Sequence, residues 1–141
     1  MTEEELKKRT KQFALRILKL ISALPNTTAG RNINNQLARS GTSVAANYRA
    51  ACRGRSKAEF ISKLGVVEEE ADESAFWLEL IIEGELLKKS LVEPLWREAY
   101  ELVTIMTSSR KSASRSTISV SSRKDLRGRS AAPIANQKSK I

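Results

Sequence analysis

The chain has 141 residues, of which 40% are hydrophobic and 29% are charged, the usual composition of one globular domain. It contains a single cysteine and no histidine, which excludes an intramolecular disulfide framework and most histidine-based chemistry. The net charge of +9 is concentrated near the C-terminus: residues 1–110 carry 17 Lys and Arg against 15 Asp and Glu, whereas residues 111–141 carry 8 against 1.

The composition favours helices over sheets, because aromatic residues make up only 5% of the chain and it contains only 3 prolines and 6 glycines. No apolar run reaches the roughly 20 residues that a membrane-spanning helix needs. The N-terminal sequence also lacks the hydrophobic core of a signal peptide. We therefore expect an all-α, cytoplasmic protein of a bacterial type, with no membrane partner.

The first predicted helix covers Glu3 to Leu24, where three leading glutamates favour the helix N-terminus. Pro25 then opens a loop. The second helix is predicted to begin near Thr28, with this residue as its N-cap. Its interior glycine, Gly41, costs roughly 1 kcal/mol relative to alanine. This cost indicates either a close approach of two helices or a helix break that forms an anion-binding nest.

A turn is predicted between Arg53 and Ser56. Gly54 falls where the left-handed residue after a helix is expected. Ser56 and Glu59 follow as a capping box, so the third helix is predicted over Lys57 to Lys88.

A second connection is predicted over Ser90 to Glu93, and the fourth helix is predicted to begin near Glu93 and to fade around Arg110. Residues 1–110 should then form an antiparallel, up-down-up-down four-helix bundle. Beyond them Ser, Lys and Arg dominate and apolar residues are isolated. Residues 111–141 are therefore predicted to be a disordered basic tail, which cannot bury enough surface to offset its ordering entropy.

Catalytic and metal chemistry find little support in this sequence. The glutamates gather on one predicted helix, and no histidine accompanies them, so a di-metal bundle site is not expected. Cys52 lacks a histidine base; it is either a small, half-buried residue or a thiol activated by nearby arginines. We expect no metal, no cofactor and no enzymatic activity.

An acidic cluster lies in the middle of the third predicted helix, at Glu68, Glu69, Glu70, Asp72 and Glu73. Carboxylates at i and i+4 repel each other unless a cation compensates them. Either an arginine of the neighbouring helix (Arg39, Arg49 or Arg53) or of another subunit supplies that charge, or the cluster is simply solvated.

Five cations surround the turn between the second and third helices, and we name them the basic corner: Arg49, Arg53, Arg55, Lys57 and Lys63. They either contact phosphates or form a solvated surface. The basic tail adds to the first interpretation, because Arg, Lys and Ser segments bind RNA or DNA without sequence preference. Base-specific recognition is not expected, because Tyr48 is the one aromatic residue near the corner.

The segment Gln36 to Asn47 resembles the QLxRSxxSVxAN pattern of the 23S rRNA-intervening-sequence proteins, a family of four-helix bundles. The resemblance continues through Ser56 to Leu64, which matches S-x-x-[ED]-F-I-x-x-L, and through the acidic stretch Glu70 to Leu80. It covers roughly residues 13–106. Within the matched segment, five residues form a signature that we expect to pack helices together: Arg39, Ser40, Gly41, Ser43 and Asn47.

This resemblance implies a homopentameric ring without established enzymatic activity. Related accessory proteins of diversity-generating retroelements bind nucleic acid and a reverse transcriptase through a basic surface. Where many members read Asn-Ile-Ala-Glu-Gly, this chain has Asn47 to Ala51, with Ala50 in place of the acid. The replacement makes the corner more positive.

The sequence therefore predicts a non-enzymatic, oligomeric bundle that binds RNA or other nucleic acid through phosphates. The alternative is a scaffold that docks a partner protein and has no nucleic-acid role. Self-association is also favoured by apolar residues that could lie on the outer faces, such as Trp77, Leu80 and Trp96.

Overall fold

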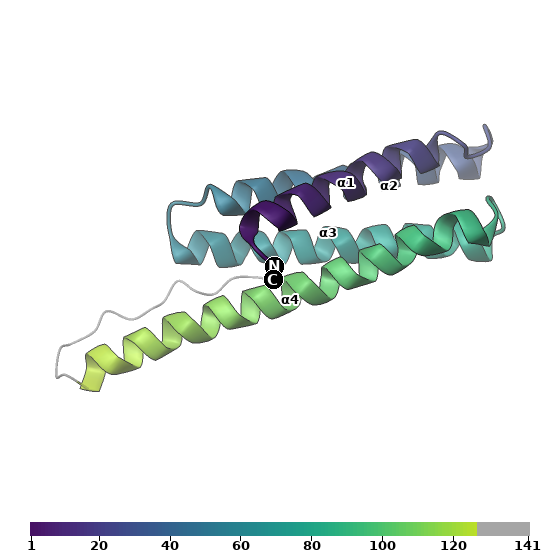
Figure 1. The fold of residues 1–141 in the computed structure, drawn as a ribbon. Coiled ribbons are helices and arrows are strands. Elements are labelled where there is room, and N and C mark those ends of the chain that lie inside the picture. Colours follow the sequence, from purple (N-terminus) through teal and green to yellow (C-terminus); the bar gives the residue numbers. More distant parts are fainter. Residues whose placement is uncertain (127–141) are drawn as a thin grey trace.

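The computed structural model describes residues 1–126, with side chains through residue 116, and every regular element in that range is an α-helix. The four helices are α1 (Glu3–Ile21), α2 (Thr28–Cys52), α3 (Lys57–Glu83) and α4 (Lys89–Leu126) (Figure 1). Among these residues no helix is long and apolar enough to span a bilayer. The all-α, four-helix prediction is confirmed.

Successive helices run antiparallel and lie side by side (Figure 1). The contacts between α3 and α4 show the direction, because Glu68 in the middle of α3 bonds Thr107, whereas Glu79 near the end of α3 bonds Trp96, which comes earlier in α4. α1 closes the bundle against α4 through Arg9, which donates hydrogen bonds of 2.7 and 2.9 Å to Glu98. The connections are short, as an up-down-up-down bundle requires.

Side-chain caps begin the first three helices. Thr2 and Glu5 form a complete capping box at α1. Thr27, one residue earlier than predicted, caps α2. At α3 Ser56 accepts from the Glu59 N–H as predicted, but the Glu59 carboxylate accepts from the Arg55 N–H at 2.7 Å. This bond ties Glu59 to the backbone of the turn.

The core is a continuous apolar cluster to which all four helices contribute. Its fully buried large side chains include Phe13, Ile17, Leu37, Val44, Leu64, Val67, Leu78, Ile81, Val92, Leu102 and Met106. Within α3, Phe60 and Ile82 are only partly buried. Ile61 and Ala75 are buried there as well.

A close contact between two helices lies where α2 crosses α1. A Cβ atom on Gly41 would meet two carbon atoms of the Ile17 side chain at 2.9 Å, closer than real Cβ atoms approach. On the other side of α2, the buried hydroxyl of Ser74 donates a 2.9 Å hydrogen bond to Ser40. Helix α2 continues unbroken through Gly41. The close-approach interpretation therefore describes the geometry, and a helix break does not occur.

Several predicted helix boundaries differ from the structure. Helix α1 ends at Ile21 and not at Leu24. Gly54 does not adopt a left-handed conformation, and α2 ends at Cys52 with Arg53 as its C-cap. Helix α3 ends at Glu83, not Lys88, because Glu85 (φ 55°) turns the chain into a Schellman motif. In that motif the Glu85 and Leu86 N–H groups donate to Ile82 and Ile81. Lys89 accordingly begins α4, so the connection is residues 84–88, and Pro94 lies inside the helix.

Helix α4 continues past Arg110 to Leu126, so the predicted end of this helix was too early. Its last fully buried residue is Met106, and the segment beyond it leaves the bundle (Figure 1). No proline or glycine interrupts residues 95–127. Extending a helix whose first turns are already packed costs far less than nucleating one, so the helix propagates. The rest of the predicted tail, residues 127–141, lies outside the described residues.

We expect Gly41→Ala to lower the free energy of unfolding by about 1 kcal/mol. The added methyl overpacks the Ile17 contact by about 1–3 kcal/mol, and the gain in helix propensity of about 1 kcal/mol offsets only part of it. Urea denaturation of the variant measures the change. In an Ile17→Ala background, where the opposing atoms are gone, the same substitution should become stabilising. A stabilising effect in the native background would contradict the packing argument.

Candidate nucleic-acid interface

Four of the five predicted corner residues surround one open hollow of about 350 Å³: Arg49, Arg53, Arg55 and Lys63. Ala46 and Ala50 line it as well and share a face of α2 with Arg49 and Arg53, since these residues follow i, i+3, i+4 and i+7 spacing. Arg55 comes from the turn and Lys63 from the second turn of α3. Lys57 is exposed but does not line the hollow.

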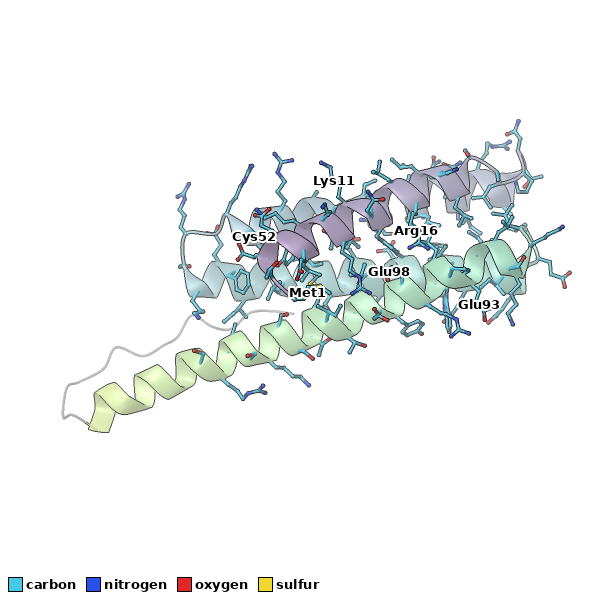
Figure 2. All side chains as sticks on the ribbon, in the orientation of Figure 1. Met1, Lys11, Arg16, Cys52, Glu93 and Glu98 are labelled. Atoms are coloured by element: carbon cyan, nitrogen blue, oxygen red, sulfur yellow. The ribbon has the colours of Figure 1, made fainter. Side chains whose placement is uncertain are left out.

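None of the five corner cations has a carboxylate within ion-pair distance among the side chains of residues 1–116. All of them except Lys63 are exposed. At the end of the bundle marked by Cys52, long side chains with nitrogen tips point away from the ribbon (Figure 2). Glu59 is the one acid that lines the hollow, and its carboxylate is tied to the Arg55 N–H. An excess of uncompensated positive charge therefore faces solvent here.

Other arginines of the bundle are engaged between helices. Arg39 of α2 bonds Glu70 at 3.1 Å and Glu73 at 2.6 Å, so it supplies the counter-charge that the sequence left open among three arginines. Its hydrogen bond holds the pKa of Glu73 below the ordinary value. Arg110 of α4 bonds Glu68 at 2.9 Å. These pairs join helices, which the corner cations do not.

Glu68 shows how strong the α3–α4 pairing is. Burial by itself would raise the pKa of this carboxyl group, but hydrogen bonds from Arg110 and Thr107 outweigh burial and lower it. Half-buried on both sides, the Arg110–Glu68 pair fixes α4 at the level where it leaves the bundle. Three of the five carboxylates in the predicted acidic cluster (Glu68, Glu70 and Glu73) are thus structural.

The projecting part of α4 leaves the bundle at the end that holds the α2–α3 turn (Figure 1). Lys111 and Arg115 lie on it, and both are exposed. Neither has an ion-pair partner among the described side chains. The sequence suggested two separate basic regions, and the structure places the start of the second at the same end of the molecule as the basic corner. The composition of the chain could not predict this proximity, because it depends on the end of the bundle from which α4 projects.

The predicted packing residues divide into two groups. Arg39, Ser40 and Gly41 contact neighbouring helices through an ion pair, a buried hydrogen bond and backbone approach. Asn47 instead donates to the Ser43 carbonyl, 3.0 Å away in its own helix. The pattern therefore mixes residues that join helices with residues that bond within α2.

Cys52 lies half-buried near Tyr48. Burial raises the pKa of its thiol, which opposes the thiolate that a nucleophile or metal ligand needs. In the part of the chain that the structure describes, no three His, Cys, Asp or Glu side chains gather closely enough to hold a metal ion. The raised pKa therefore argues against the interpretation of Cys52 as a thiol activated by nearby arginines.

Comparison with known proteins agrees with this architecture. The model of the 23S rRNA-intervening sequence protein family matches residues 2–108. A crystal structure of a protein of unknown function from the S23 ribosomal protein family of Bacteroides thetaiotaomicron superposes with a TM-score of 0.70. The two sequences are 35% identical, and the match covers 74% of this chain and 97% of that one. No curated protein matches this chain.

We expect Cys52 to react slowly with iodoacetamide near pH 8. Its raised pKa leaves less thiolate than an unfolded chain has, and its half-buried position limits access. Alkylation rates followed by mass spectrometry across pH 7–10 should give a midpoint above that of the urea-unfolded protein. A midpoint below the unfolded value would instead indicate a thiol activated by the nearby arginines.

Proposed function

The chain belongs to the 23S rRNA-intervening sequence protein family, and we propose that it is a non-enzymatic, oligomeric bundle that binds RNA, or nucleic acid more broadly, through phosphate contacts. The observation that carries this proposal is the hollow at the basic corner, where four cations converge without carboxylate partners among the described residues. Arginine and lysine that are already paired would have to break a bond to reach a phosphate. The corner cations can reach a phosphate without first breaking an ion pair.

The physical basis of binding is counterion release. Each phosphate that a cation neutralises frees a condensed counterion, which makes affinity fall steeply with salt. The corner lacks stacking residues at its surface, since Tyr48 is buried. Contacts of this kind position a nucleic acid and carry no base sequence. Lys111 and Arg115 on the projecting α4 extend the positive surface from the same end of the bundle.

Oligomerisation would multiply these contacts. The family resemblance implies a pentamer, and the exposed apolar side chains Leu15, Leu18 and Leu91 supply surface that association can bury. A ring repeats the corner around its axis, so weak individual contacts add through effective concentration.

We expect the full chain to bind a fluorescent 20-nucleotide RNA, with affinity that falls as salt rises. The triple variant Arg49→Ala, Arg53→Ala, Arg55→Ala should lower affinity about tenfold or more at 50 mM salt. It should also flatten the slope of log K against log[salt], by about 0.7 for each phosphate of the single strand that the variant leaves without a cation. Fluorescence anisotropy across a salt series measures both quantities.

The matched control removes three exposed cations from α1: Lys8→Ala, Lys11→Ala and Arg16→Ala. It should weaken binding less than the corner triple, and an equal effect would show general attraction instead of a site. Ala50→Glu is a complementary test, because Ala50 lines the hollow and a carboxylate there repels phosphate without removing an arginine. If only removal of residues 111–141 weakens binding, the α4 extension is responsible and the corner is not.

The second candidate function is a scaffold that docks a partner protein without nucleic acid, and the same exposed apolar residues favour it. Capture of a partner that persists after nuclease treatment would support this alternative, provided that the chain itself fails to bind RNA at low salt.

The assembled state has its own test. We expect the mass in solution, measured by light scattering at micromolar concentration, to be that of a closed oligomer. Leu15→Glu, Leu18→Glu should reduce that mass if α1 lies in the interface, since the two carboxylates would be buried unpaired. A native chain that remains a monomer would refute both the ring and the contribution of effective concentration to binding.

A further inference from the structure

A second charged surface, of opposite sign, runs along the outside of α3. Four carboxylates and one aromatic residue follow each other at alternating spacings of three and four residues: Glu69, Asp72, Phe76, Glu79 and Glu83. This spacing places them on one face of the helix. None of the four carboxylates has a cation within ion-pair distance among residues 1–116. We name this set, with Trp96 and Tyr100 of α4 beside it, the acidic aromatic face.

The aromatic residues of this face are unusually open to solvent. Phe76 is 49% exposed and Tyr100 is 43% exposed, although both are large. The Phe76 ring stands edge-on to Trp77 with centroids 5.1 Å apart, and Tyr100 meets Trp96 in the same way at 4.9 Å. Exposed rings held in fixed pairs present a rigid surface that loses little side-chain freedom on binding.

The Glu79 carboxylate joins the two helices of the face. It accepts hydrogen bonds from the Trp96 Nε1–H at 3.3 Å and the Tyr100 hydroxyl at 3.2 Å. The negative charge of Glu79, together with that of Asp72, raises the pKa of Tyr100. A hollow of about 180 Å³ lies alongside, lined by three carboxylates (Glu79, Glu83 and Glu93), one cation (Lys89), Ile82 and Trp96, so carboxylates outnumber cations there. Carboxylates and ring surfaces thus lie together in a negative field.

Charge decides which partner fits. Phosphates of a nucleic acid or of an anionic lipid would be repelled here, whereas a cationic side chain would gain ion pairs and ring contacts together. Guanidinium suits such a surface better than ammonium, because it stacks on aromatic rings and bonds carboxylates in bidentate fashion. From Glu69 to Glu83 the face is roughly 21 Å long, at about 1.5 Å per helical residue. An extended peptide of about six or seven residues spans that length.

We propose that the acidic aromatic face binds an arginine-rich segment of a partner polypeptide. The segment lies along α3, its guanidinium groups pair with Asp72, Glu79 and Glu83, and one or more of them stack on Phe76 or Tyr100. This surface is separate from the basic corner and does not depend on nucleic-acid binding.

The test uses the full chain and a fluorescein-labelled nona-arginine peptide, with nona-lysine for comparison, in fluorescence anisotropy at 100 mM salt. The peptide should bind, arginine more tightly than lysine. Asp72→Asn, Glu83→Gln should weaken binding at least fivefold; both residues are exposed and have no ion-pair partner among the described side chains, so folding should persist, as circular dichroism can verify. The matched control, Glu3→Gln, Glu4→Gln, removes the same charge from α1 and should have less than a twofold effect.

Phe76→Ala separates this face from general charge attraction. It leaves every carboxylate in place and should weaken arginine binding two- to fivefold, with a smaller effect on lysine. Equal effects of the two carboxylate doubles, or no effect of Phe76→Ala, would overturn the proposal. So would a Phe76→Ala variant that dissociates an oligomer, since the face would then be an interface between copies. The corner triple variant should still bind the peptide, so failure of RNA binding and failure of this proposal are distinguishable.

Discussion

The bundle depends on how closely α2 approaches its neighbours at two adjacent small residues. Gly41 leaves no room for a Cβ atom against Ile17 of α1, and the next residue back, Ser40, is bonded to Ser74 of α3 inside the core. Protein interiors are close-packed, so a larger side chain at either position must displace a neighbouring helix. The crossing therefore sets how far apart α1 and α3 lie. It also fixes the direction in which the last turns of α2 deliver Arg49 and Arg53 to the corner.

Charged residues in this protein divide by what they contact. One set joins helices: Arg9 with Glu98 and Glu101, Arg39 with Glu70 and Glu73, and Arg110 with Glu68. Arg9, Glu98, Arg110 and Glu68 are partly buried, so removing one partner would leave the other uncompensated. Arg39 and Glu101 are exposed, so their pairs are better screened by solvent. The corner cations and the carboxylates of the acidic aromatic face form no ion pair among the described side chains. Other carboxylates of α3 do form ion pairs with arginines of α2 and α4. Within the described part of the chain, the cations of the basic corner and the carboxylates of the acidic aromatic face do not, and they leave their charge at the surface.

The sequence was sufficient for elements whose signals are local. Helical periodicity placed α1 and α2, and the Ser56 cap placed the start of α3 at Lys57. It was insufficient at the end of α3, because Leu86 and Leu87 continue an apolar pattern and yet pack on the core from a loop. The Schellman turn there uses Glu85, not a glycine, in the left-handed conformation, so the usual signal was absent. Low apolar content also concealed the extension of α4, whose helix propagates from packed turns.

The candidate site also combines features that the sequence predicted with features that it could not predict. Spacing alone put Arg49 and Arg53 on one helical face, and the hollow follows that face. Which arginine compensates the acidic cluster depends on the level at which α2 lies beside α3, and three arginines were equally suitable in sequence. Lys57 belongs to the basic corner but does not line the hollow, because the first turn of α3 directs successive side chains around the helix. Whether a cation lines the hollow therefore depends on the direction of its side chain more than on the composition of the segment.

Helix α3 contributes residues to both charged surfaces, and the distance between these surfaces governs how they interact. Lys63 at the corner and Glu69 at the start of the acidic aromatic face are separated by about 9 Å along the helix, at about 1.5 Å per residue. That is close to the Debye length of about 8 Å at physiological ionic strength. At low salt the acidic aromatic face therefore repels a phosphate chain that approaches the side of the bundle, and confines it to the end where the corner and α4 lie. At physiological salt the repulsion is largely screened, so ligands of opposite charge at the two proposed binding surfaces would interfere little with each other.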